Sequence, residues 1–490
     1  MRAPVGNGDL MRSLVVGAGE AGTTLVRALR HTPSLGLLPV GFLDDDPGKK
    51  RAQGLAVLGP TTALARIAAE RSIDVVIIAI PRLPPAEIRR LGQAALAAGA
   101  SVRYLPSFVA ALERDARISD LRRLRVSDLL GRSERHVVRA ASRDAVAGKR
   151  VLVTGAGGSI GAELCRQVAC FGPAALYMLD HDESNLHGLQ LQLEGHALLD
   201  SDRLIIADVR DAARIRQVLD AVRPQVVFHA AAHKHLPLLE LHPCEAVKSN
   251  VMGTAILVDA AIEFAAERFI LISTDKAADP TSVLGATKRL AEMIVQRRAG
   301  GAARLASVRF GNVLGSRGSF LATLSGQLEN GEPVTVTHPD VTRFFMTVEE
   351  AVGLVLEAAS MAETGEVFVL DMGDPVRILD LVREFAAQLH VGEDDLDIRF
   401  TGLRPGEKLN ECLFSSTEQR SGTTHPRIWA AHTSPPGPPF SEGLQRLLVA
   451  ADQNRSEDVR RELAALLAGY RPSEAAEAAG VLAAPYPDGF

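Results

Sequence analysis

Two segments of the chain begin in the same way, and this repeat constrains the fold more than any other feature. The first segment, SLVVGAGEAGTTLVRAL, begins at Ser13, and the second, KRVLVTGAGGSIGAELCRQ, begins at Lys149. Each is a short apolar run, a glycine-rich loop and an amphipathic helical pattern, in that order. A doubly wound parallel sheet opens in this way. The sequence therefore predicts an α/β protein with two such domains.

The first domain is predicted over residues 1–106, as a Rossmann-like nucleotide-binding domain. Its further strands are expected in LLPVGFLDDDP, IDVVIIAIP and SVRYLP, with helical patterns at Thr61–Arg71 and Pro85–Ala98 between them. Residues 107–148 are rich in arginine and poor in periodicity, which is typical of a solvated linker.

The second domain is predicted over residues 149–415. Its expected strands are Arg150–Thr154, Ala175–Asp180, Arg203–Ala207, Gln225–His229, Arg268–Ser273 and Arg304–Phe310. Helical patterns separate them, so the sheet should be mostly parallel. After residue 319 the alternation breaks down, which predicts a small α/β substrate lobe over the carboxyl edge of the sheet. Residues 416–490 should form C-terminal helices within Gly443–Tyr470, followed by a tail.

Composition excludes several classes of protein. The formal charge of −5 gives no support for nucleic-acid binding. The four cysteines lack the paired spacing of a metal site and fit a reducing compartment. No apolar run reaches the roughly 18 residues of a membrane-spanning helix, and the first residues lack a hydrophobic signal region. We therefore expect a cytoplasmic protein without a metal ion.

The loop TGAGGSIG carries the three glycines of a dinucleotide fingerprint, Gly155, Gly158 and Gly161. They permit a tight turn, close approach of the backbone to a pyrophosphate, and close packing of helix against strand. The next strand ends at Asp180, whose carboxylate suits ribose hydroxyls and repels a 2′-phosphate, so NAD is favoured. The expected cofactor-binding set is Gly155, Gly158, Ser159, Ile160, Gly161, Asp180, Asp208, Val209, Ala230, Ala231 and Lys288.

The first glycine loop has the same spacing, with Gly17, Gly19 and Gly22. The strand after it ends in Asp44, Asp45 and Asp46, and no reaction centre is recognisable downstream. Two interpretations stay open for this domain, a regulatory nucleotide pocket and an empty structural unit.

The strand that ends in FHAAAHKHLPLLE places small residues, then His233, Lys234 and His235, at the same edge. Small side chains leave room for a cofactor. The two histidines have no carboxylate or cysteine partner at a useful spacing, which argues against a metal site. Lys234 is expected to face a substrate anion, with a solvated loop lysine as the alternative.

The segment STDKAADPTSVLGATKR ends another strand on an acid and a base. Thr274 can hydrogen-bond a sugar hydroxyl, and Asp275 and Lys276 can act as acid and base if burial moves their pKa values toward neutrality. Lys288 can orient the nicotinamide ribose and lower the pKa of a nearby hydroxyl. An exposed ion pair is the alternative for Asp275 and Lys276, and the upstream fingerprint argues against it.

Two loops rich in Arg, Lys and Gly, RFGNVLGSRGS and RPGEKLNE, together with HPDVTRFFM, suit an anionic nucleotide ligand. The candidate substrate-binding residues are Lys234, His235, Asn312, Ser316, Arg317, Arg343, Arg404 and Glu407.

These motifs occur in the order found in one family. The chain resembles the nucleoside-diphosphate-sugar 4,6-dehydratases of capsule and O-antigen biosynthesis, in the extended short-chain dehydrogenase/reductase superfamily. VLVTGAGGSIGAEL, HAAAHKHLPLLE, NVMGT, STDKAADPTSVLGATKR, RFGNVLGSRGS, HPDVTRFFMT and RPGEKLNE carry the resemblance, over about Lys149 to Phe414. The first domain and DLLGR (Asp128 to Arg132) are similar to the long, membrane-associated branch.

The resemblance implies a reaction. NAD⁺ takes hydride from C4 of a UDP-N-acetylhexosamine, which we expect to be UDP-N-acetylglucosamine; water is lost from C5–C6, and the hydride returns at C6. By similarity, Thr274 would bind the C4 oxygen, Asp275 would protonate the departing C6 hydroxyl and Lys276 would remove the C5 proton. Lys288 would hold the cofactor and assist C4 deprotonation.

The chain departs from the family pattern in two places. The superfamily has Tyr where this chain has Leu284, and the long branch often has Met; a leucine has no proton to exchange, so Asp275 or Lys288 would have to take its place. Long members also begin with transmembrane helices, whereas this chain begins at its first Rossmann-like unit, so the anchor is either naturally absent or removed.

Three alternatives to the dehydratase remain: a nucleotide-sugar 4-epimerase, a dehydratase that inverts C5, and an inactive sugar-nucleotide sensor. An epimerase needs no Asp-Lys elimination pair, which argues against the first. The segments Gly253–Ala266 and Leu284–Arg298 resemble the helix pair of the superfamily's dimeric bundle, so a homo-oligomer is expected.

Overall fold

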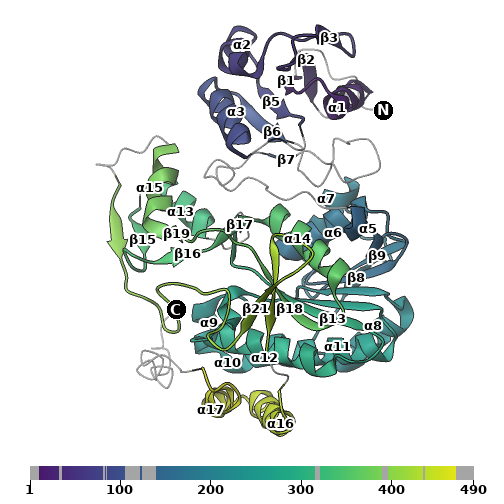
Figure 1. Cartoon of the computed structure of the whole chain (residues 1–490), viewed down its shortest axis with the longest axis vertical. Helices are drawn as coiled ribbons and strands as arrows, with labels where there is room; N and C mark the ends of the chain where they lie inside the picture. Colours follow the sequence, from purple (N-terminus) through teal and green to yellow (C-terminus); the bar gives the residue numbers. More distant parts are fainter. Residues whose placement is uncertain are drawn as a thin grey trace. The chain divides into compact units, whose positions relative to one another are not determined.

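A computed structural model describes residues 10–31, 36–80, 83, 85–104, 122–123, 140–314, 320–330, 332–388, 396–433 and 436–470. The chain divides into two compact units, Met1–Ala140 and Ala141–Phe490, and the division falls within the predicted linker. Each unit is built on a largely parallel β-sheet flanked by helices (Figure 1). The predicted fold class is confirmed.

The first unit has a five-stranded sheet in the order β2-β1-β5-β6-β7, parallel except for the β6–β7 pair. Its strands are β1 (Met11–Val16), β2 (Leu37–Leu43), β5 (Val75–Ile78), β6 (Ser101–Tyr104) and β7 (Arg122–Arg123), with a separate hairpin of β3 (Arg51–Ala52) and β4 (Leu55–Ala56). Its helices are α1 (Glu20–His31), the 3-10 turn η2 (Thr61–Ala63), α2 (Leu64–Glu70) and α3 (Pro85–Ala97). All of β5 is buried, as expected for an apolar strand covered on both faces.

The second unit has a nine-stranded sheet in the order β10-β9-β8-β11-β12-β13-β18-β22-β21. Its strands are β8 (Arg150–Thr154), β9 (Ala175–Asp180), β10 (Leu204–Ile206), β11 (Val226–His229), β12 (Arg268–Ile272), β13 (Arg304–Arg309), β18 (Thr364–Leu370), β21 (Gln419–Gly422) and β22 (Ile428–His432). The six strands predicted for this sheet are all present. Chain order reverses between β8 and β11, and such a switch point is where open α/β sheets bind ligands.

Helices cover both faces of this sheet. In Figure 1, α6 and α14 pack together on one face, while α8, α11 and α12 lie on the other. The helices are α5 (Ala140–Asp144), α6 (Ser159–Cys170), α7 (Glu183–Glu194), α8 (Ala212–Val222), α9 (Leu236–Leu241), α10 (Pro243–Ala246), the π-helical η5 (Val247–Met252), α11 (Gly253–Glu263), α12 (Val283–Arg298) and α14 (Val348–Met361). The Ser282 hydroxyl caps α12 by accepting a 3.1 Å hydrogen bond from the Gly285 amide.

The region after residue 319 is short and mixed, as predicted, but part of it returns to the large sheet. The lobe contains α13 (Phe320–Glu329), α15 (Ile378–Gln388) and three strand pairs: β14 (Asn312–Leu314) with β17 (Phe345–Thr347), β15 (Val334–Val336) with β20 (Ile398–Phe400), and β16 (Thr342–Arg343) with β19 (Val376–Arg377). β18, β22 and β21 instead extend the main sheet. The sequence analysis missed β21 and β22 because one is polar and both are short.

Two C-terminal helices, α16 (Pro439–Asp452) and α17 (Ser456–Leu466), pack against η5, α10 and α12 of the same chain. Leu447 and Leu463 join the core formed with Val251 and Leu290. The surface that the sequence analysis assigned to a partner subunit is thus partly covered within the chain. The expected homo-oligomer stays a prediction. Among the described residues, no helix has the length and hydropathy needed to cross a bilayer.

Candidate active site

A cavity of about 720 Å³ lies at the carboxyl ends of β8, β11 and β12, below the small lobe. It brings together residues that are far apart in the sequence. Of the predicted site residues, it is lined by Gly155, Gly158, Ser159, Ile160, Gly161, Ala230, Lys234, His235, Thr274, Lys276, Leu284, Lys288, Asn312, Arg343, Arg404 and Glu407.

A second cavity, of about 200 Å³, adjoins the first and shares Gly155, Gly158 and Ala230 with it. It is lined by the remaining predicted cofactor residues, Asp180, Asp208, Val209 and Ala231. Together the two cavities run across the switch point of the sheet, on either side of the glycine loop. A long ligand with a phosphate near its middle fits this arrangement.

The glycine loop leaves no room for side chains. Gly155 has φ of +64°, and a Cβ there would lie 2.7 Å from the Ala231 amide nitrogen. At Gly161, a Cβ would lie 2.0 Å from the carbonyl oxygen of Gly155. The amide of Gly157 donates a 2.8 Å hydrogen bond to Asp180 Oδ2, which fixes the loop against the end of β9. The observed geometry is that of a loop against which a pyrophosphate can lie at the start of α6.

The far end of the second cavity contains a basic residue that the sequence analysis missed. Arg210 pairs with Asp208 at 2.6 Å and with Glu245 at 2.9 Å. Burial alone would raise the pKa of Asp208, but the hydrogen bonds from Arg210 outweigh it and the pKa is lowered. The Asp208 carboxylate is therefore held ionised beside this guanidinium.

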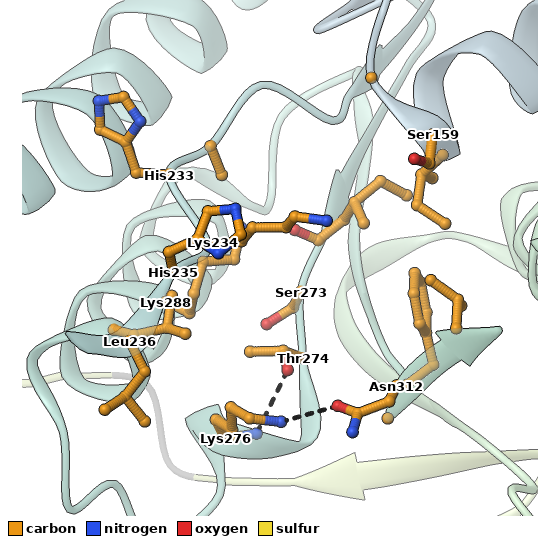
Figure 2. Close-up of a pocket in the computed structure, with 18 of the residues that line it drawn as sticks. Ser159, His233, Lys234, His235, Leu236, Ser273, Thr274, Lys276, Lys288 and Asn312 are labelled. Carbon is orange, nitrogen blue, oxygen red and sulfur yellow. Dashed lines mark hydrogen bonds between the residues drawn. The ribbon is translucent and has the colours of Figure 1, made fainter. Parts of the chain in front are cut away.

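The segment at the end of β12 forms a compact polar cluster. Asp275 is fully buried and does not itself line the cavity; its Oδ1 accepts hydrogen bonds from Thr274 Oγ1 at 2.8 Å and from Lys276 Nζ at 3.0 Å. Lys276 Nζ also donates to Asn312 Oδ1 at 3.2 Å (Figure 2). The pair is thus enclosed rather than exposed, with Thr274 and Lys276 between Asp275 and the cavity.

The pKa of Lys276 is set by opposing effects. Burial lowers it, but the carboxylates of Asp275 and Glu411 attract the ammonium more strongly and the net pKa is raised. Glu411 was not among the predicted site residues. It lines the cavity, and its Oε1 lies 3.8 Å from Lys276 Nζ.

Leu284 lines the cavity and is 5% exposed, so an apolar side chain occupies the position at which the superfamily has a hydroxyl. One turn later, Lys288 donates a 2.6 Å hydrogen bond to the Ile272 carbonyl oxygen. Burial lowers the pKa of Lys288 to about 8, partly offset by Glu292. An amine with this pKa can change its protonation state near neutral pH.

The loop after β11 is held by a residue that the sequence analysis did not single out. Asn250, in the motif NVMGT, accepts the His233 amide at 2.9 Å and donates to the His233 carbonyl oxygen at 3.1 Å. In Figure 2 the His233 ring points away from the group formed by Lys234, Thr274 and Lys276. His233, Lys234 and His235 all line the cavity, and Asn250 fixes the backbone of His233, from which Lys234 and His235 follow.

The small lobe contributes the opposite wall of the cavity. Arg343 Nη2 pairs with Glu407 Oε1 at 2.6 Å, while Arg404 is exposed at the rim. Ser316 and Arg317 lie outside the described residues. Arg309 belongs to the loop RFGNVLGSRGS, which the sequence analysis assigned to an anionic nucleotide ligand, but Arg309 does not line the cavity.

Arg309 is buried completely and forms ion pairs with Glu292 at 2.6 Å and Glu418 at 2.7 Å. The prediction that this loop suits an anionic nucleotide ligand is therefore wrong for the Arg309 side chain. Its ion pairs instead join β13, α12 and the segment before β21. Sequence periodicity could not show this because the partners lie 17 and 109 residues away.

No group of three or more metal-ligating side chains occurs in the part of the chain that the structure describes.

The glycine loop at the switch point of the sheet and the small lobe on the opposite wall of the cavity define an α/β protein with the extended short-chain dehydrogenase/reductase fold. Residues 151–433 match the family described as "Polysaccharide biosynthesis protein", and residues 4–106 match a family described as "CoA-binding domain". The chain belongs to the polysaccharide biosynthesis protein family.

Individual relatives differ in the activity that their names state. The chain is 41% identical, over 85% of its length and 70% of the relative's, to "Probable polysaccharide biosynthesis protein EpsC" of Bacillus subtilis. It is 32% identical, over 55% of its length and 79% of the relative's, to "UDP-glucose 4-epimerase" of Rickettsia rickettsii. Among solved structures, Pen from Bacillus thuringiensis matches 60% of this chain and 88% of its own, with a TM-score of 0.53 and 30% identity.

Proposed function

We propose that the chain is an NAD-dependent enzyme that modifies a sugar nucleotide, and specifically a UDP-N-acetylglucosamine 4,6-dehydratase for polysaccharide biosynthesis. One observation carries the proposal: the enclosed Asp275–Lys276 pair lies next to a cavity that is also lined by the glycine loop. An acid and a base side by side suit an elimination, which must protonate one carbon substituent and deprotonate the neighbouring carbon.

The residues present fit NAD. Gly155 and Gly158 line both cavities at the start of α6, where a pyrophosphate can lie, and Asp180 and Val209 line the cavity expected to hold the adenosine. When bound, NAD supplies the hydride acceptor and donor for the sugar. Lys288 and the small residue Ala230 would hold its nicotinamide half beside Thr274.

The proton of the C4 hydroxyl needs an acceptor, and Leu284 cannot provide one. Thr274 Oγ1 already donates to Asp275 Oδ1 at 2.8 Å, so a C4 hydroxyl that donates to Thr274 can pass its proton to Asp275. The proton arrives at Oδ1, which also accepts from Lys276 Nζ at 3.0 Å, while Oδ2 is buried with no hydrogen-bond partner among the described residues. Asp275 thus replaces the missing tyrosine.

The same proton then serves the elimination. Asp275, once neutral, can pass its proton back through Thr274 Oγ1 to the departing C6 hydroxyl, which leaves as water while Lys276 removes the C5 proton. Burial beside the cavity strengthens these interactions relative to water. When the hydride returns at C6, Lys276 returns a proton to C5, and the product is a 4-keto-6-deoxy sugar nucleotide.

Incubation of the purified full chain with NAD and UDP-N-acetylglucosamine, followed by mass spectrometry, tests the proposal. A product lighter than the substrate by one water supports a dehydratase. An isomer of unchanged mass would instead support a 4-epimerase. Unchanged substrate across a panel of nucleotide sugars, with sugar nucleotide still bound, would support the inactive sensor. Proton NMR of the product formed in D₂O distinguishes retention from inversion at C5.

A further inference from the structure

Glu411 is a buried carboxylate that the proposed mechanism does not use. Its side chain is 2% exposed and lines the cavity, at the end of the loop Arg404–Glu411. Its Oε1 lies 3.8 Å from Lys276 Nζ and its Oε2 lies 3.7 Å from Lys408 Nζ. Oε2 has no hydrogen-bond partner among the described residues. Burying a carboxylate whose two lysine neighbours lie beyond hydrogen-bond distance is costly, and its Oε1 is the oxygen that faces Lys276.

The fold holds this loop against the segment that follows Asp275. Lys408 Nζ donates to the Ala278 carbonyl oxygen at 2.7 Å, and Thr281 Oγ1 donates to the Gly406 carbonyl oxygen at 3.0 Å. Gly406 has φ of +74°, and a Cβ there would lie 2.8 Å from Ser282 Cβ. These contacts fix where the loop lies, and Glu411 therefore faces Lys276 as part of the fold.

The surroundings of Lys276 make a proton acceptor necessary. Asp275, Glu411 and, with opposite sign, Arg343 are the charged groups that act on it, and their sum raises its pKa despite burial. A protonated amine cannot remove the C5 proton. In the proposed mechanism Asp275 already holds the proton from the C4 hydroxyl. Glu411 is then the remaining carboxylate in contact with the ammonium.

We propose that Glu411 accepts a proton from the Lys276 ammonium, so that the neutral amine can remove the C5 proton of the 4-keto sugar. The inference rests on the proposed function. One proton moves from nitrogen to the Glu411 carboxylate, the amine then takes the C5 proton, and both transfers reverse when C5 is reprotonated. The transfer requires the 3.8 Å separation to close by roughly 1 Å, to hydrogen-bond distance. Glu411 is thus a positioning and proton-holding residue that acts through Lys276.

The variant Glu411→Gln tests this inference, with Glu442→Gln on the exposed surface of α16 as the matched control. In the presence of UDP-N-acetylglucosamine and NAD, Glu411→Gln should still form the reduced cofactor absorbance, while C5 proton exchange and water loss slow by about 100-fold. Glu411→Asp should recover part of the loss, whereas a purely structural role would not separate the two steps. Water loss at the wild-type rate in Glu411→Gln would overturn the inference.

A second readout does not depend on turnover. The pH dependence of reductive methylation of Lys276, read by peptide mass spectrometry on the full chain, should shift to lower pH in Glu411→Gln and stay unchanged in Glu442→Gln. An unshifted profile in Glu411→Gln would contradict contact between the two groups. If the wild-type chain dehydrates no nucleotide sugar, the proposed function fails, and this profile still decides whether Glu411 controls the protonation of Lys276.

Discussion

The two Rossmann-like units share the same glycine loop but differ in what surrounds it. In the first unit, the Ala18 amide donates to Asp44 Oδ2 at 2.7 Å; in the second, the Gly157 amide donates to Asp180 Oδ2 at 2.8 Å. A Cβ on the third glycine would collide with the first in both, at 1.9 Å for Gly22 and 2.0 Å for Gly161. The loop pattern therefore defines the same turn twice.

The difference lies on the neighbouring strand. The first glycine of the first unit faces Ile80, whose Cγ1 would lie 2.5 Å from an added Cβ, whereas Gly155 faces Ala231. Lys49 also pairs with Asp44 at 3.0 Å, while Asp180 lines a cavity. The comparison teaches that the fingerprint fixes the backbone, and that the residues after the next strand decide how much space remains for a ligand.

The largest expected effect is on the rate of water loss, which should depend on a lysine of the second unit and not on one of the first. Lys276→Ala should lower the rate of water loss by about 1,000-fold or more, because the elimination loses its base. Lys49→Ala, which removes the lysine paired with Asp44 in the first unit, should leave the rate unchanged. Product formation measured by mass spectrometry, with bound NAD counted in both variants, checks this. An equal loss of activity in both would break the distinction between the units.

The second prediction concerns ion pairs. Arg309→Met leaves Glu292 and Glu418 buried without their partner and should cost about 3–5 kcal/mol of local unfolding free energy. Arg66→Ala removes the exposed pair with Glu70 in the first unit and should cost about 0.5 kcal/mol or less. Hydrogen exchange of α12 and α2 in the full chain reports each loss. Similar costs would show that the buried network does not stabilise the second unit.

The third prediction concerns the glycines themselves. Gly155→Ala should weaken NAD binding by about 100-fold, because the added Cβ collides with the Ala231 amide and displaces the glycine loop that is expected to bind the pyrophosphate. Gly17→Ala has a similar backbone cost but should leave NAD affinity unchanged. Calorimetric titration with NAD measures both. If Gly17→Ala weakens binding as strongly, the NAD measured is held in the first unit.

The smallest expected effect is a pH dependence of stability. The pKa of Lys288 is lowered by burial to about 8 in the folded chain, from an ordinary value of 10.5. Below pH 8 both folded and unfolded chains carry the proton, so the cost of the buried charge is fully present. Between about pH 8 and 10.5 the unfolded chain binds more protons, and folding stability rises with pH.

Lys288→Met removes this contribution and provides the comparison. The stability of the wild type relative to Lys288→Met should increase by about 1–3 kcal/mol as pH rises through that range. Chemical unfolding at a series of pH values measures the difference. A difference that stays constant with pH would mean that Lys288 is not protonated differently in the two states.

Much of the fold followed from the sequence because its signals are local. The glycine loops and the apolar runs such as Arg268–Ile272 lie within one turn or strand of the feature they define. The contacts that were missed are long-range. Glu411 reaches Lys276, and Arg309 reaches Glu418, only after the small lobe folds back onto the sheet. No spacing along the chain encodes those pairs.

A crystal structure of the full chain with NAD and UDP-N-acetylglucosamine tests the central claim most directly. The account predicts that the C4–C6 edge of the hexose lies within hydrogen-bond reach of Thr274 and Lys276, with C4 toward the nicotinamide and Glu411 drawn closer to Lys276. A sugar ring bound elsewhere, with Lys276 still enclosed between Asp275 and Asn312, would contradict it.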